Sequence, residues 1–142
     1  MVALGIFESA EGNTVLAETE CRRLLGTRAF GRVGLTTGAL PMIMPVEYVY
    51  DQGVITFRTE HDTKLVAAVH GAVLAFEVDA YDAESGTGWT VHVLGRATVI
   101  GAQYEAAPMP TLDDERPVGP RRHYVRLHCE IVSGRRLASS PR

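Results

Sequence analysis

Apolar and polar residues alternate along six stretches of the chain, which is the pattern of β-strands that bury one face. These stretches span residues 29–36, 42–50, 54–59, 73–80, 89–100 and 123–131. After the second stretch, Asp51-Gln52-Gly53 offers the turn of a β-hairpin, in which Gly53 is free to adopt a positive φ. Pro45 has no backbone N–H to donate, which indicates a sheet edge, a bulge or a ligand-facing position.

Two short segments carry helical spacing instead. Residues 16–26 place Cys21, Leu24 and Leu25 on one side, and Gly26 is expected to end that helix. A second helix is expected to begin at residue 62 or 63, directly after the third predicted strand.

Six alternating strands with two short helices predict a mainly β protein. Strand edges that would otherwise be exposed are hidden when the sheet closes on itself, so a six-stranded antiparallel Greek-key barrel is the simplest architecture. The chain has 142 residues, of which 46% are hydrophobic, and this is sufficient for one domain with its own core. We therefore expect a single domain over residues 1–142, with residues 1–15 as a loosely ordered arm.

The charge and the cysteine content of the sequence limit the kinds of partner that we expect and the cellular compartment. The formal net charge is −3, and the seven arginines in the last 27 residues accompany no recognition helix, so we expect no nucleic acid partner. No stretch approaches the roughly 18 consecutive apolar residues of a membrane span, and we expect no membrane partner. Cys21 and Cys129 form no CxxC pair and are expected to be buried free thiols in a reducing cytoplasm.

The most informative polar residues lie where the third predicted strand meets the second predicted helix. There Arg58, Thr59 and Lys64, the only lysine of the chain, combine a guanidinium, a hydroxyl and an ammonium group with the free amides of a helix N-terminus. This set suits a phosphate dianion. The alternative is that Arg58 and Lys64 are solvated charges whose aliphatic stems lie on the barrel.

Aromatic residues could complete a site for a flat heteroaromatic ligand, although each is equally suited to the core. The candidates are Tyr48, Phe57, Trp89 and Tyr124. Other chemistries lack their motifs: there is no GxSxG elbow, no HExxH or HxH metal spacing, and no GxGxxG after a strand.

Three segments together resemble the flavin-binding split-barrel family related to pyridoxamine 5′-phosphate oxidase. They are PVEYVYDQGVITFRTEHDTKL at 45–65, AFEVD at 75–79 and GWTVHVLGRA at 88–97. The resemblance extends over about residues 16–137. It implies a barrel that forms a homodimer, with FMN bound in clefts at the subunit interface. Lys64, Arg58 and Thr59 would hold the FMN phosphate, and Trp89 would reach the site from the second subunit.

The resemblance further implies that the backbone around Val46 and Glu47 faces the edge of the isoalloxazine ring. The complete set of expected cofactor-binding residues is Val46, Glu47, Tyr48, Phe57, Arg58, Thr59, Lys64 and Trp89. Relatives usually carry asparagine where this chain has Glu47. The arginine- and histidine-containing C-terminal motif of true pyridoxamine phosphate oxidases is missing, so we reject the vitamin B6 reaction.

Three functions fit this sequence. The first is an FMN-dependent oxidoreductase that passes hydride or electrons at flavin N5 to a small-molecule substrate. The second is a reductase that uses a deazaflavin cofactor, and the third is a flavin-binding, stress-related protein without efficient turnover. No residue indicates the acceptor or a catalytic side chain.

Overall fold

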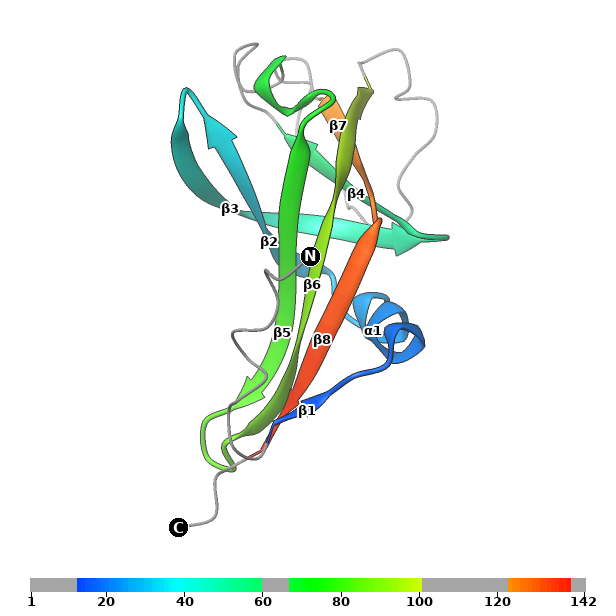
Figure 1. Ribbon diagram of the computed structural model, residues 1–142, viewed down its shortest axis with the longest axis vertical. Coiled ribbons are helices and arrows are strands. Elements are labelled where there is room, and N and C mark those ends of the chain that lie inside the picture. The colour runs from blue at the N-terminus through cyan, green and yellow to red at the C-terminus, as the bar shows by residue number, and fades with distance from the viewer. Residues whose placement is uncertain (1–12, 60–66, 101–122, 139–142) are drawn as a thin grey trace, which may run out of the picture.

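The computed structural model describes residues 13–59, 67–100 and 123–138, which form an antiparallel barrel with an extension (Figure 1). The strands in these ranges are β1 (Thr14–Val15), β2 (Phe30–Thr37), β3 (Leu40–Asp51), β4 (Val54–Thr59), β5 (Val73–Asp82), β6 (Thr87–Ile100), β7 (His123–His128) and β8 (Ile131–Leu137). Helix α1 spans Glu18–Leu25, and residues 67–69 are also helical. No helix in the described ranges is long and apolar enough to cross a membrane.

Six strands close the barrel, as the alternation predicted. Their order is β6-β5-β2-β3-β4-β7, and β7 pairs back onto β6 from Ala97↔Leu127 to Ile100↔Tyr124. The order β5-β2-β3-β4 is that of a Greek key, because β5 returns beside the first strand of a three-strand meander. The predicted six-stranded antiparallel Greek-key barrel is therefore confirmed.

The last predicted strand, residues 123–131, is wrong as a single element. It breaks at Cys129 and Glu130, after which β8 pairs with the other half of β6, from Leu94↔Ile131 to Gly88↔Leu137. The break coincides with Gly95 of β6, where an added Cβ would overlap with the carbonyl oxygen of His128. At this close backbone crossing, the strand partner of β6 changes: the last part of β6 pairs with β7 in the barrel, and its first part pairs with β8 outside it. The crossing requires glycine at position 95.

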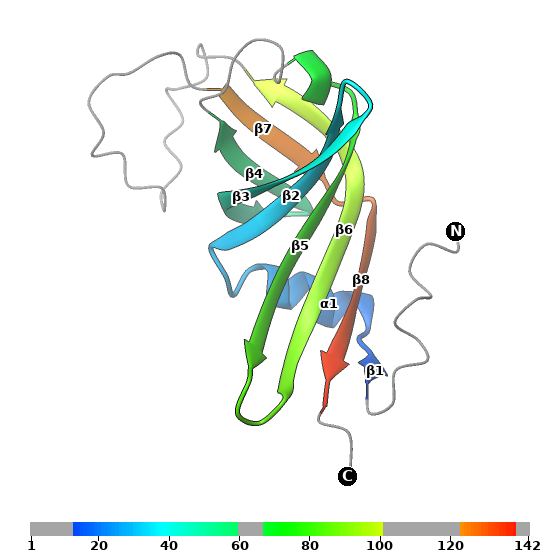
Figure 2. The same cartoon turned by 90° about the vertical axis from the view of Figure 1, so that its left-hand side faces the viewer.

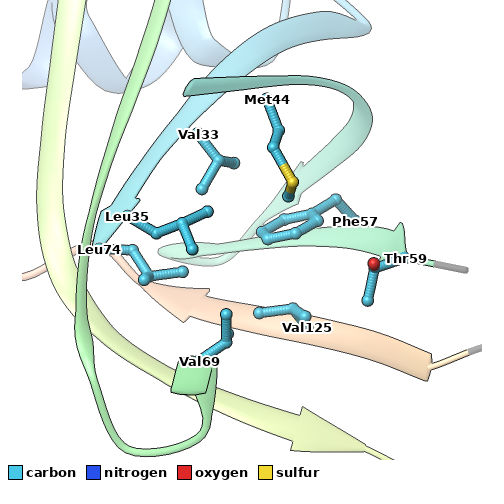
Figure 3. A pocket seen from close by; sticks show the side chains of 8 residues that line it. All are labelled: Val33, Leu35, Met44, Phe57, Thr59, Val69, Leu74 and Val125. Atoms are coloured by element: carbon cyan, nitrogen blue, oxygen red, sulfur yellow. The ribbon is translucent and has the colours of Figure 1, made fainter. Parts of the chain in front are cut away.

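The barrel interior is filled by the apolar residues of the alternating pattern. Figure 3 shows side chains from β2, β3, β4, β5 and β7 meeting there. A cavity among these side chains has a volume of about 10 Å³, which is roughly the space of one water molecule. In the part of the barrel that the structure describes, these interior positions are therefore core positions.

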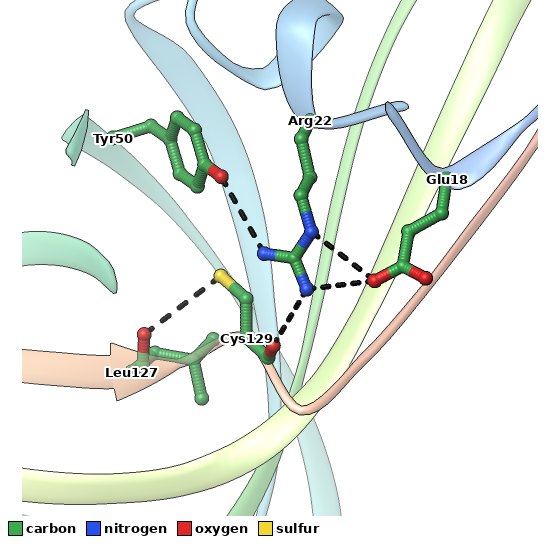
Figure 4. Close-up of polar contacts among 5 residues, drawn as sticks. All are labelled: Glu18, Arg22, Tyr50, Leu127 and Cys129. Carbon is green, nitrogen blue, oxygen red and sulfur yellow. Dashed lines mark hydrogen bonds and ion pairs between the residues drawn. The ribbon is translucent and has the colours of Figure 1, made fainter. Parts of the chain in front are cut away.

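Helix α1 packs against β8 and β6 below the barrel (Figure 2). It buries Cys21, Leu24 and Leu25, and Gly26 ends it, both as predicted. Arg22 fixes its outer side: the guanidinium donates to the Cys129 carbonyl at 3.2 Å and to the Tyr50 hydroxyl at 3.5 Å (Figure 4). The helix is thus attached to the point where β7 gives way to β8.

Candidate functional site

The barrel opens where β3 leaves β4 and continues along β2. Among the described residues, the last β3–β4 pair is Tyr48↔Phe57, and beyond it β3 pairs with β2 alone, as in Phe30↔Glu47. Glu47 and Arg58 both lie one residue beyond that last pair. We call the region between the two strands where their pairing ends the β3–β4 opening. Pro45 lies along it, paired with Arg32 of β2, which is compatible with the predicted edge or ligand-facing position.

The backbone of Glu47 points into this opening. The Tyr48 N–H donates to the Ala29 carbonyl at 2.9 Å, so the peptide groups of Tyr48 face β2. In an antiparallel strand, neighbouring residues direct their N–H and C=O groups to opposite sides. The N–H of Glu47 therefore faces away from β2, toward the side where pairing with β4 has ended. This is the backbone segment that the sequence predicted to face a cofactor.

Arg58 and Thr59 lie at the end of β4 but on opposite faces. Thr59 is only 6% exposed and faces the interior beside Val125 (Figure 3). Arg58 is half-buried on the outer face, paired with Tyr124 of β7. A ligand that contacts both side chains must therefore cover the end of the strand. Lys64, together with the predicted start of the second helix, lies outside the described residues.

Besides Thr59, three predicted site residues have side chains inside the barrel. Val46, Tyr48 and Phe57 are 7%, 2% and 1% exposed. The Tyr48 hydroxyl donates to the Leu25 carbonyl at 2.6 Å, and its ring meets Phe76 edge-on with 4.8 Å between ring centroids. Burial raises the pKa of Tyr48 to about 12, which keeps the hydroxyl protonated as a donor. Any ligand outside the barrel would meet only the backbone of these residues.

Trp89 lies far from the β3–β4 opening within the same chain. It is near the start of β6, paired with Ala80 of β5, and the β5–β6 hairpin projects away from the end of β4 in both views (Figures 1 and 2). The guanidinium of Arg28 lies 5.9 Å from the centre of a Trp89 ring, beside a surface hollow of about 510 Å³. One chain alone therefore cannot bring Trp89 and Arg58 to one ligand.

The outer surface of the barrel carries an apolar row that crosses five strands. The row consists of the paired residues Ile43, Gly34, Ala75, Leu94 and Ile131. Ile43 is 75% exposed, and a groove of about 460 Å³ runs along this surface. Such continuous exposed apolar surface is typical of protein–protein contacts.

A polar row follows two residues further along the same strands, with Arg32 beside Glu77 and Glu77 beside His92. Arg32 Nη1 lies 3.3 Å from Glu77 Oε2 and 3.9 Å from Asp79 Oδ2, so two carboxylates share one guanidinium. Burial, reinforced by the adjacent Asp79, raises the pKa of Glu77 to about 7. Burial also lowers the pKa of His92. This cluster is not apparent in the sequence, because its members come together only through strand register.

Nucleophilic and metal chemistry find no support among the described residues. Cys21 and Cys129 are buried free thiols, as predicted. Burial raises the pKa of Cys129 to about 11 and also raises that of Cys21, so neither is a thiolate at neutral pH. No group of three or more metal-binding side chains occurs within the described ranges.

These features define a six-stranded antiparallel split barrel in which the pairing of β3 with β4 ends partway along β3. The chain belongs to the pyridoxamine 5′-phosphate oxidase family, whose model matches residues 17–136. It is 33% identical to the uncharacterized protein Rv0080 of Mycobacterium tuberculosis, over 95% of this chain and 92% of that protein.

Two solved structures share both sequence and fold with this chain. The FAD binding protein from Mycobacterium smegmatis is 31% identical, with a TM-score of 0.65, over 87% of this chain and 97% of that chain. A conserved protein of unknown function from Corynebacterium diphtheriae is 27% identical, with a TM-score of 0.65, over 90% of this chain and all of that chain (100%). The family expected from the sequence motifs is thereby confirmed.

Proposed function

We propose that this chain binds a flavin nucleotide at the β3–β4 opening, in a site that two copies complete together. The observation that carries the proposal is that the Glu47 amide faces away from β2 just where pairing with β4 ends, with Arg58 and Thr59 one and two residues beyond the last pair on β4. A relative that shares 31% of its sequence is an FAD binding protein, which supports a flavin as the ligand.

The residues present fit a flavin held outside the barrel. The described internal cavity of about 10 Å³ is too small for an isoalloxazine ring, which supports a ring placed outside the barrel along the opening. There a guanidinium and a hydroxyl at the end of β4 suit the phosphate, and Lys64 is five residues beyond Thr59. FMN is the cofactor expected from the sequence, and FAD and a deazaflavin are the alternatives to test.

When bound, the flavin would supply hydride or electron transfer at N5 to a small-molecule acceptor. The role of the protein chain is to bind the flavin and to orient it. Arg58, Thr59 and Lys64 would hold the phosphate, while the Glu47 N–H would donate to the ring edge and favour negative charge there. Oxidoreductase chemistry of this kind needs no nucleophile, in agreement with the protonated thiols of Cys21 and Cys129.

The second copy supplies what one chain lacks. Trp89 lies on the β5–β6 hairpin, away from Arg58, so it joins the site only if another chain presents it. The apolar row, in which Ile43 and Ala75 are exposed and Leu94 is half-buried, offers the surface for that contact. A two-fold dimer would repeat each contact and produce two equivalent sites. The buried free thiols fit a protein of the reducing cytoplasm.

The test is a titration of the purified, flavin-stripped protein with FMN, FAD and a deazaflavin, followed by flavin fluorescence or absorbance. Arg58→Ala combined with Lys64→Ala should weaken flavin binding by at least tenfold without unfolding the protein. The matched control is Arg126→Ala, which removes an exposed arginine from the outer face of β7, opposite Thr56, and should leave affinity unchanged.

Full flavin affinity in the double variant would refute the phosphate assignment. If the deazaflavin binds more tightly than the flavins and its affinity falls steeply with salt, the cofactor is a deazaflavin and not a flavin. The salt dependence is expected because a multiply charged tail is then being neutralised. Binding of none of the three would refute the proposed function.

A further inference from the structure

We propose that pairing of two copies through the outer face takes up protons at the cluster of Arg32, Glu77 and Asp79, so that the assembled form is favoured as the pH falls. The inference rests on the proposed function, since it concerns the contact that completes the flavin site. It goes beyond it by making that contact respond to pH.

The cluster lies beside the surface available for pairing. Gly34 in the apolar row and Arg32 in the polar row are two residues apart on β2, and Ala75 and Glu77 repeat this spacing on β5. A partner of ordinary interface size covers many such residues on each side. A second copy that packs against the apolar row containing Ile43 would therefore also cover Glu77.

Charge in this cluster is incompletely balanced. One guanidinium faces two carboxylates, at 3.3 Å from Glu77 and 3.9 Å from Asp79. Among the residues that the structure describes, the strand neighbours of this row add no second fixed positive charge: β6 presents His92, β3 presents Pro45 opposite Arg32, and β8 presents Ser133 opposite His92. Arg135 of β8 lies in the next row, opposite Thr90.

Covering this cluster removes water from a carboxyl group that is already partly protonated near neutral pH. Burial in the single chain, with the adjacent Asp79, raises the pKa of Glu77 to about 7, and further burial against a partner raises it again. The dimer then binds more protons than two separate chains. By linkage, its dissociation constant increases with pH, by up to about tenfold per pH unit for each proton taken up.

The experiment is sedimentation velocity over a concentration series at pH of about 6, 7 and 8.5, at constant ionic strength. The wild-type dimer should weaken by roughly 10- to 100-fold between the extremes, as expected for one to two linked protons. Glu77→Gln, which keeps the shape and an acceptor for Arg32, should remove most of this dependence and hold the dimer together at high pH.

The matched control is Glu84→Gln, an exposed carboxylate of the β5–β6 turn, which should keep the wild-type dependence. Asp79→Asn removes the like charge beside Glu77 and should also reduce the dependence, so the inference remains testable if Glu77→Gln folds poorly. A dimer whose affinity does not change with pH, or an unchanged slope in Glu77→Gln, would overturn this inference alone. A monomer at every pH would overturn the shared site as well.

Discussion

Replacing Tyr48 by phenylalanine separates a core role from a cofactor-binding role at a residue that the sequence placed in the site. The substitution removes one hydroxyl and leaves the ring in the core beside Phe76. That hydroxyl donates to the Leu25 carbonyl at 2.6 Å, in surroundings where Tyr48 is 2% exposed. Leu25 is the last residue of α1, so its carbonyl has no partner within the helix.

The expected cost follows from the loss of this donor. A buried carbonyl left without a hydrogen bond costs about 1–3 kcal/mol. Water cannot easily replace the donor, because Tyr48 is 2% exposed and Leu25 is fully buried. We expect the free energy of unfolding to fall by about 1–3 kcal/mol. In chains somewhat larger than this one, each kcal/mol lost lowers the melting temperature by roughly 2–4 °C.

The assay is urea denaturation followed by tryptophan fluorescence, with flavin affinity measured on the same samples. Tyr81→Phe is the control, because Tyr81 is 61% exposed on β5 and its loss of a hydroxyl should have little effect on stability. Flavin affinity should be unchanged in both variants. A Tyr48→Phe protein of wild-type stability, or one that folds normally but loses flavin, would refute the assignment of Tyr48 to the core.

Three further perturbations test other parts of the account. Gly95→Ala should destabilise the fold by about 3 kcal/mol or more in thermal or urea unfolding, because the added Cβ would overlap with the His128 backbone. Gly34→Ala is the control and should be tolerated, since its Cβ would meet the Cβ of Ala75 at 3.4 Å. Equal effects of the two substitutions would refute the backbone crossing. Ile43→Asp should shift the protein to monomers in sedimentation while circular dichroism stays unchanged, since Ile43 is 75% exposed, and an intact dimer would remove the apolar row from the interface. Iodoacetamide at a pH of about 8 should leave Cys21 and Cys129 unmodified in the folded protein and alkylate both in urea, because burial protects them and raises their pKa values; rapid labelling of either in the folded state would contradict this.

The period-two pattern was sufficient to predict the barrel because each strand buries one face. It could not predict the break at Cys129 and Glu130, since apolar alternation continues across that point. The break is set by the backbone crossing at Gly95, which depends on the position of another strand. The local sequence pattern shows which face of a strand is buried. Only the assembled sheet shows where a strand changes from one pairing strand to another.

The site was predictable only in part, for the same reason. Residue types at the end of the third predicted strand indicated Arg58 and Thr59, and both are at the end of β4, but on opposite faces of the strand. An aromatic residue in an alternating strand can serve a core or a ligand, and the burial of Tyr48 shows that its side chain serves the core. Arg32 and Glu77 are 45 residues apart in sequence, and register alone makes them neighbours.

The central claim, that two copies build one flavin site, is tested most directly by mixing two defective variants. One variant carries Arg58→Ala with Lys64→Ala, and the other carries Trp89→Ala; each alone should bind flavin poorly. After unfolding and refolding together, random pairing should place one intact site in each mixed dimer and restore roughly a quarter of the wild-type sites, measured by flavin titration. No recovery of binding in the mixture, although sedimentation shows mixed dimers, would contradict the shared site.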